Sequence, residues 1–178
     1  MSRISKLLTN YQAQLNLSWE KGLHGAEKTW FVVYEPSDER RIRANIGEFE
    51  LLTIQAQKRW KHFNLTNSFE QWLSVSEYRE AYFEDPEFLE MQYGEYEQYL
   101  HEQIQSEIQS CSPDTVFAIS GIATLFGFIL VSQLIGGLAD LVQGRLLVFF
   151  PGSVEANAYR LLNARDGWNY RAVVISAR

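Results

Sequence analysis

The order of apolar and polar residues predicts strands and helices that alternate along the chain. Short runs of apolar, β-branched and aromatic residues are typical of strands, whereas apolar residues three or four positions apart are typical of amphipathic helices. Several of the short runs are apolar on both faces, as in buried parallel strands. The sequence therefore predicts an α/β fold of Rossmann-like or RecA-like type, an open and mainly parallel sheet of about five strands with helices on both faces. The predicted strands are residues 30–34, 60–65, 115–119, 146–150 and 171–176.

Helical spacing accounts for the segments between these strands. The N-terminal segment has apolar residues at helical positions, and Ser37 can cap a helix that follows the first strand. No linker separates two cores, so we expect a single α/β domain over residues 1–178, with a helical, acidic insert at about 68–109. The other predicted helices lie within residues 4–17, 69–109, 125–142 and, as a short helix, 155–162.

The carboxyl ends of the predicted strands are the first place to look for a site. Open parallel sheets bind ligands in the crevice beyond these ends, where loops from several strands meet. The fourth strand is expected to stop in Phe149-Phe150-Pro151-Gly152, because proline cannot donate to a ladder and glycine permits a sharp turn. The loops expected on this edge are Glu35-Pro36, Thr66-Asn67, Ser120-Gly121 and Pro151-Gly152.

Composition and charge narrow the classes of function. The sequence has 22 acidic and 16 basic residues, a formal net charge of −6, so autonomous binding to nucleic acid is not favoured. The one cysteine, Cys111, cannot close a disulfide within the chain, and a lone thiol suits a reducing cytoplasm. Residues 1–17 lack the continuous apolar segment of a signal peptide. We therefore expect a cytoplasmic protein.

Charged residues are distributed unequally along the chain. The insert carries many acidic residues against Arg79 alone, and residues 40–61 contain the only basic region. Each region has two interpretations: a solvated face that keeps the protein soluble, or a docking surface for a partner of opposite charge. The acidic side chains of the insert are Glu70, Glu77, Glu80, Glu84, Asp85, Glu87, Glu90, Glu95, Glu97, Glu102 and Glu107. The basic region consists of Arg40, Arg41, Arg43, Lys58, Arg59 and Lys61.

A membrane span is the alternative interpretation of residues 115–139, which contain no charge and are long enough to cross a bilayer. The stretch is interrupted at Ser120-Gly121, and Ser132 and Gln133 stand in its second half without flanking basic anchors. A buried strand followed by a buried helix explains this pattern better, so we expect no membrane association.

No familiar catalytic or cofactor motif occurs in the sequence. Residues 121–127 are similar to a phosphate-binding loop, but they have one residue too many and no Lys-Ser or Lys-Thr after them. There is no Gly-x-Gly-x-x-Gly fingerprint and no serine in a nucleophile elbow, and the three histidines lie far apart without partners at ligand spacing. We expect neither a cofactor nor a metal and find no support for catalysis, although an active site assembled in space stays open.

Four segments of the second half resemble the BrxB family, a component of BREX (bacteriophage exclusion) systems in prokaryotes. The family pattern has an apolar strand with a small-residue turn, a helix, a strand ending in Phe-Phe-Pro-Gly, a Leu-rich turn and a final Asp-x-x-Tyr-Tyr-Arg-Ala-like strand. The similar segments here are Phe117-Ala118-Ile119-Ser120-Gly121, Leu147-Val148-Phe149-Phe150-Pro151-Gly152, Tyr159-Arg160-Leu161-Leu162 and Asp166-Gly167-Trp168-Asn169-Tyr170-Arg171-Ala172.

The first half is similar to the family only in arrangement. Val33-Tyr34-Glu35-Pro36 resembles its first strand, and Phe63-Asn64-Leu65-Thr66 its second. The crossover helix departs from the family, because Leu130-Val131-Ser132 and Gly136-Gly137 stand where more polar residues are expected.

The resemblance implies a non-catalytic adaptor or assembly subunit of an anti-phage defence complex, which acts with a PglZ-type phosphatase-like protein and an ATPase. Homo-oligomer formation stays open. The alternative is a nucleotide or phosphate sensor that uses the loops at the carboxyl ends of the strands. The candidate binding residues, taken from these loops and the family motif, are Glu35, Pro36, Ser120, Gly121, Phe150, Pro151, Gly152, Arg160, Asn169 and Tyr170.

Overall fold

The five predicted strands are all present and form one parallel sheet. The structure, a computed structural model, describes residues 1–164 and 167–178. The strands of the main path are β1 (Thr29–Tyr34), β2 (Arg59–Asn64), β3 (Thr115–Ser120), β4 (Arg145–Glu155) and β7 (Val173–Ile175). Their order across the sheet is β2-β3-β4-β1-β7, and each neighbouring pair is parallel. The predicted α/β fold with an open, mainly parallel sheet is therefore confirmed.

The helices follow the predicted order, with different boundaries. Ser37 lies inside a short 3-10 helix and does not cap α2, which begins one residue after Asp38. The predicted crossover helix at 125–142 is shorter, and the left-handed Gly127 separates it from the 3-10 turn before it. The α-helices are α1 (Arg3–Leu15), α2 (Glu39–Gln55), α3 (Ser68–Val75), α4 (Arg79–Glu84), α5 (Pro86–Glu90), α6 (Tyr93–Gln109) and α7 (Val131–Ala139). The 3-10 helices are η1 (Gly25–Lys28), η2 (Pro36–Asp38) and η3 (Ile122–Leu125).

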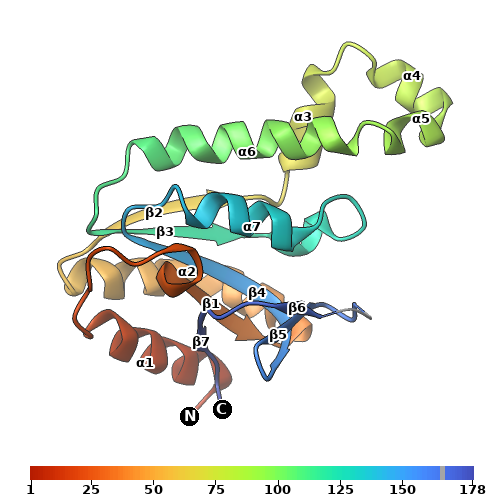
Figure 1. Ribbon diagram of the computed structural model, residues 1–178. Coiled ribbons are helices and arrows are strands. Elements are labelled where there is room, and N and C mark those ends of the chain that lie inside the picture. Colours follow the sequence, from red (N-terminus) through yellow and green to blue (C-terminus); the bar gives the residue numbers. More distant parts are fainter. Residues whose placement is uncertain (165–166) are drawn as a thin grey trace.

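The sheet separates two hydrophobic clusters, because successive side chains of a strand point to opposite faces. In β1, Trp30 and Val32 pack with α1 and α2, whereas Phe31 and Val33 pack with α6 and α7. Figure 1 shows α1 and α2 on one side of the sheet and α6 and α7 on the other. This three-layer arrangement leaves the two ends of the strands as the surfaces where loops from different elements meet.

The fourth strand continues where the sequence predicted its end. β4 pairs with β1 as far as Pro151, opposite Tyr34, and then pairs antiparallel with β5 (Ala158–Leu161), which in turn pairs with β6 (Trp168–Asn169). β3 pairs with β4 only as far as Val148, so the missing N–H of Pro151 interrupts no bond to β3. The proline therefore ends the parallel part of the strand without stopping it.

A hairpin replaces the short helix predicted at 155–162. Ala156 and Asn157 have φ values of 48° and 67°, and they form the two-residue loop between Glu155 and Ala158. Two successive left-handed residues are typical of a type I′ hairpin turn. The prediction was wrong because alanine is rare at the first of these positions and the usual Asn-Gly signal is absent.

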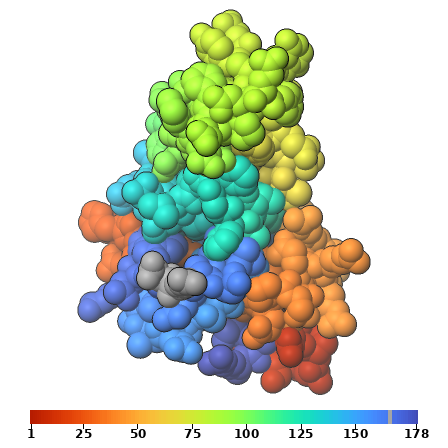
Figure 2. Space-filling model, turned by 90° about the vertical axis from the view of Figure 1, so that its right-hand side faces the viewer, coloured from red at the N-terminus to blue at the C-terminus, as the bar shows by residue number. Residues whose placement is uncertain are grey.

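The helical insert projects beyond the sheet. Figures 1 and 2 show α3, α4, α5 and the start of α6 at one end of the molecule, above the sheet and α7. Its interior is aromatic: the Trp72 and Tyr82 rings stack with centroids 6.2 Å apart, and Tyr96 contacts Trp72 and Phe69. Tyr96 also shares a 2.7 Å hydrogen bond with Ser68, which ties α6 to the start of α3.

Among the residues that the structure describes, no helix is both long and apolar enough to cross a membrane. The uncharged segment 115–139 instead contains the buried β3 and the nine-residue α7.

Candidate functional site

A cavity of about 410 Å³ lies at the carboxyl end of the sheet, on the edge where the sequence placed a site. It is lined by the ends of β1 and β7, the extension of β4 and the first turns of α1. Glu35 and Gly152, both predicted site residues, line it, and Pro36 follows in η2. The strand ends thus bring together two of the predicted loops.

Charges of both signs meet in this carboxyl-edge cavity. The buried Asp38 carboxylate accepts hydrogen bonds from Arg3 Nη1 at 3.1 Å and from Arg41 Nη1 at 3.4 Å. Lys6 and Arg178 also line the cavity, together with Glu35. Because Asp38 already pairs with Arg3, the cavity does not present a concentrated positive charge to an anion.

The tyrosine at the end of β1 is held neutral beside this cavity. The Tyr34 hydroxyl donates to Glu39 Oε2 at 2.6 Å, and Arg43 Nε donates to the other oxygen of Glu39 at 2.9 Å. Burial, followed by the hydrogen bond to the Glu39 carboxylate, raises the pKa of Tyr34 far above its ordinary value. Tyr34 therefore acts as a hydrogen-bond donor and not as a base.

Ser120 and Gly121 lie two strands away from Glu35 and belong to a different environment. His62 Nε2 is 2.7 Å from Ser120 Oγ, a contact between β2 and β3 that the sequence did not predict. Burial lowers the pKa of His62, which favours the neutral ring. The Ser120 side chain is buried, 4% exposed, so its hydroxyl joins two strands and is closed to a substrate.

Glycine is required at position 121 for two reasons, a left-handed backbone conformation and the lack of space for a side chain. Its φ is +79°, and a Cβ atom there would lie 2.8 Å from the backbone nitrogen of Thr66. The loops after β2 and β3 are therefore packed against each other without space for a ligand between them.

Of the predicted residues around the hairpin, Gly152 lines the edge cavity, whereas Phe150, Arg160, Asn169 and Tyr170 do not. Phe150 is buried against Phe31 and Tyr159, and the Gly152 backbone packs on the Arg160 carbonyl. Arg160 and Asn169 are exposed on the hairpin. The Tyr170 hydroxyl lies 3.4 Å from Thr29 Oγ1, at the amino end of β1. Asp166, which belongs to the resemblance, falls outside the described residues.

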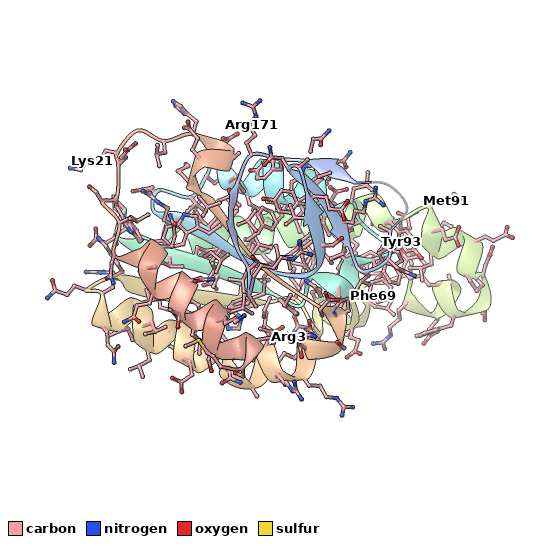
Figure 3. The ribbon with its side chains drawn as sticks, turned by 90° about the horizontal axis from the view of Figure 1, so that it is seen from below. Arg3, Lys21, Phe69, Met91, Tyr93 and Arg171 are labelled. Atoms are coloured by element: carbon pink, nitrogen blue, oxygen red, sulfur yellow. The ribbon has the colours of Figure 1, made fainter. Side chains whose placement is uncertain are left out.

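A second cavity, of about 570 Å³, lies at the amino end of the sheet, where no site was predicted from the sequence. Lys28 and Arg145, which line it, are 8% and 6% exposed. Each stands at the start of one of two paired strands, since Thr29 of β1 lies opposite Leu146 of β4. Figure 3 shows Lys21 of this amino-edge cavity far from Arg3 of the carboxyl-edge cavity.

Large apolar side chains are exposed on the projecting insert. Phe83 and Met91 are each 73% exposed, and Val75 and Tyr78 are exposed as well. Figure 3 shows Met91 at the end of the insert, beyond Tyr93 and Phe69. We call Val75, Tyr78, Phe83 and Met91 the insert patch. They are surrounded in sequence by exposed carboxylates, namely Glu77, Glu80, Glu84, Asp85, Glu87 and Glu90.

The basic region is partly neutralised within the chain. Arg41 pairs with Asp38, Arg43 pairs with Glu39, and Lys61 Nζ lies 2.5 Å from Glu107 Oε2. The Lys61–Glu107 pair connects the basic region directly to the acidic insert. Among the described residues, Arg41, Arg43 and Lys61 of the basic region form ion pairs, whereas Glu107 does so from the insert.

Comparison with known proteins adds no relative: no family model, no curated protein and no solved structure matches the chain. Within the described residues, no group of three or more His, Cys, Asp or Glu side chains could hold a metal ion.

Proposed function

We propose that this protein is a non-catalytic adaptor or assembly subunit of a prokaryotic BREX-type phage-defence complex, and that it binds a PglZ-type partner through the insert patch. The proposal combines the resemblance of four sequence segments to the BrxB family with one surface of the molecule. That surface is the exposed apolar end of the acidic insert.

The insert patch is the observation that carries the proposal. Isolated apolar residues on a surface are ordinary, but here several large apolar side chains are exposed within residues 75–91, among exposed carboxylates, and exposed apolar surface next to charge is typical of protein interaction sites. Phe83 and Met91 lie outside the sheet and outside both cores, so burying them against another protein would not disturb the two cores. The surrounding carboxylates select a partner segment that combines apolar anchors with Lys or Arg.

The alternative function, a nucleotide or phosphate sensor at the carboxyl ends of the strands, has less support. In the carboxyl-edge cavity, Arg3 already forms an ion pair with Asp38. The loops at Gly121 and Thr66 are packed against each other. The basic side chains of the carboxyl-edge cavity, Arg3, Lys6 and Arg178, share it with the carboxylates of Glu35 and Asp38, so little net positive charge is left for a phosphate.

Co-purification from the native host tests the adaptor proposal. The double variant Phe83→Ser with Met91→Ser removes the apolar anchors, and Leu51→Ser with Ile54→Ser is the matched control on α2, where both side chains are also exposed. We expect the tagged wild-type and control proteins to recover a PglZ-type protein and the insert variant to recover at least about tenfold less, because central apolar anchors contribute about 2 kcal/mol or more each.

Two results would contradict the proposal. One is the recovery of no defence-system protein by the wild type. The other is equal recovery by the wild type and the insert variant, which would place the interface elsewhere. A partner held against acidic side chains should also be released by salt, so recovery should fall between about 0.1 M and about 0.5 M salt.

A further inference from the structure

Two buried cations at the amino end of the sheet have no ion-pair partner among the described residues. Among the described residues, the buried charged side chains are Lys28 and Arg145 at this end of the sheet and Asp38 at the opposite end. Asp38 is neutralised by Arg3 and Arg41, but neither Lys28 nor Arg145 forms an ion pair with any described carboxylate. Burying a charge without an opposite charge is costly, so this pair of cations needs an explanation.

The hydrogen bonds of these two side chains do not remove their charge. Lys28 Nζ donates to the Val142 carbonyl oxygen at 2.6 Å, and Arg145 donates to the carbonyl oxygens of Gly144 and Glu20 at 3.2 and 3.3 Å. Carbonyl oxygens satisfy donors but carry no net charge. Burial lowers the pKa of Lys28, Asp140 acts in the opposite direction, and the charge of Arg145 lowers it further.

The cavity beside these cations is predominantly basic. Lys21, Lys28, Lys58 and Arg145 line it, against Glu20 and Asp114, which leaves an excess of two positive charges. The space of about 570 Å³ is in the range of small-molecule sites. The charge excess matches one phosphoryl group, which carries about −1.5 to −2 charges near pH 7.

Trp19 adds a flat aromatic ring to the lining of the same cavity. Lys58 Nζ lies 4.4 Å from the centroid of its ring, and Arg145 Cζ lies 4.7 Å away. The indole N–H of Trp19 is buried and finds no hydrogen-bond acceptor among the described residues. A buried donor without an acceptor is uncommon.

From these observations we infer that the amino-edge cavity binds a small anion through a phosphoryl group, with Lys28, Lys58 and Arg145 as its charged contacts. The bound phosphoryl oxygens add negative charge to that of Glu20 and Asp114, which line the cavity, and of Asp140, which acts on Lys28. This site is independent of the insert patch and lies at the opposite end of the strands from the loops at Glu35, Thr66, Ser120 and Pro151.

Calorimetric titration of the purified chain with inorganic pyrophosphate tests the inference, with sodium chloride at matched ionic strength as the blank. We expect saturable binding of one pyrophosphate per chain. Lys58→Met should weaken binding about ten- to hundredfold, because a hydrogen bond or ion contact to a charged group contributes about 1.5–3 kcal/mol. Lys58 is only half-buried, so this variant should fold.

Lys6→Met is the matched control, because Lys6 lines the carboxyl-edge cavity. It should leave the affinity within about twofold of the wild type, since no contact of the proposed site is lost. Absence of saturable binding at millimolar pyrophosphate would overturn the inference, and so would equal weakening by Lys58→Met and Lys6→Met.

The variant Lys28→Met distinguishes a ligand-binding role of Lys28 from a purely structural role. If Lys28 serves an anion, its replacement removes an uncompensated buried charge, and the variant should lose pyrophosphate binding while its melting temperature without ligand stays equal or rises. A lower melting temperature together with unchanged pyrophosphate affinity would contradict the inference. Parallel titrations with inorganic phosphate and ADP show which kind of phosphoryl compound binds most tightly: a free phosphate, a pyrophosphate or a nucleotide.

Discussion

Gly152 shows how one residue sets the position of the hairpin. A Cβ atom there would collide with the Arg160 carbonyl oxygen and would lie 2.9 Å from the Phe150 ring. Gly152→Ala should therefore push β5 away from β4 and lower the free energy of unfolding by about 1–3 kcal/mol, measured by urea denaturation.

Gly47→Ala is the control for this prediction. Gly47 is exposed in the middle of α2, and a Cβ atom there would meet nothing within 4 Å. Alanine at this position should raise the free energy of unfolding by about 0.5–1 kcal/mol, because glycine is a poor helix former. Equal effects at the two positions would mean that the close approach at Gly152 is not what matters.

The His62–Ser120 hydrogen bond predicts how stability depends on pH. Burial lowers the pKa of His62 in the folded protein, whereas the unfolded chain has the ordinary value of about 6.5. Above about pH 6.5 the ring is neutral in both states. Below this pH the unfolded chain binds a proton that the folded protein resists, so stability is lost as the pH falls.

Urea unfolding at about pH 7.5 and about pH 5.5 measures this effect. The wild type should lose more stability between the two values than His62→Gln does. The exposed His24 provides the control, and His24→Gln should behave like the wild type. A wild type and a His62→Gln variant with the same pH dependence would contradict the assignment.

The sequence shows that Lys28 and Arg145 precede strands, but it does not show that the two side chains line the same cavity. Lys28 stands two residues before the predicted strand at 30–34, and Arg145 stands directly before the one at 146–150. Parallel strands place their starts on one edge, so two such cations belong together once the strands are known to be neighbours. The pairing of β1 with β4 is the information that the sequence lacked, as was the pairing of β2 with β3 for His62 and Ser120.

At the scale of the element, the insert depends on the buried Tyr82. Its ring is 3% exposed and contacts Trp72 and Phe88. Tyr82→Ala should cost α4 and α5 about 3 kcal/mol or more of local stability, because a buried aromatic leaves a large cavity. Hydrogen exchange of the amides in α4 and α5 should then speed up about a hundredfold or more, while β3 and β4 stay protected.

Phe83→Ala tests the same helix without touching its packing, because Phe83 is exposed. Exchange in α4 should not change in this variant. Faster exchange in both variants would indicate that the insert is held by helix propensity and not by its aromatic interior.

Strands and helices that are buried on one or both faces were predicted well. Elements whose structure depends on the conformation of a turn were predicted poorly. The runs at 30–34, 115–119 and 146–150 correspond to β1, β3 and β4, because short continuous runs of apolar, β-branched and aromatic residues are typical of strands that are buried on both faces. The hairpin after β4 was not predicted. Its turn places Ala156 and Asn157 in left-handed backbone conformations, and the Asn-Gly pair that usually indicates such a turn is absent.

At the scale of the whole molecule, the sequence predicted the fold class but not which residues form the exposed apolar surface of the insert. The alternation of strands and helices requires a layered α/β structure, and charge counting identified the insert as acidic. The exposed apolar residues at its end could not be predicted, because the same Phe and Met residues would fit the buried side of a helix.

Site-directed photo-crosslinking in the native host tests the adaptor role most directly. A photoreactive phenylalanine analogue at Phe83 lies in the insert patch, and the same analogue at Leu51, an exposed residue of α2, is the control. We expect a crosslink from position 83 to a PglZ-type protein and none from position 51. A PglZ-type crosslink at position 51 alone, or no crosslink to a defence-system protein from position 83, would contradict the adaptor role.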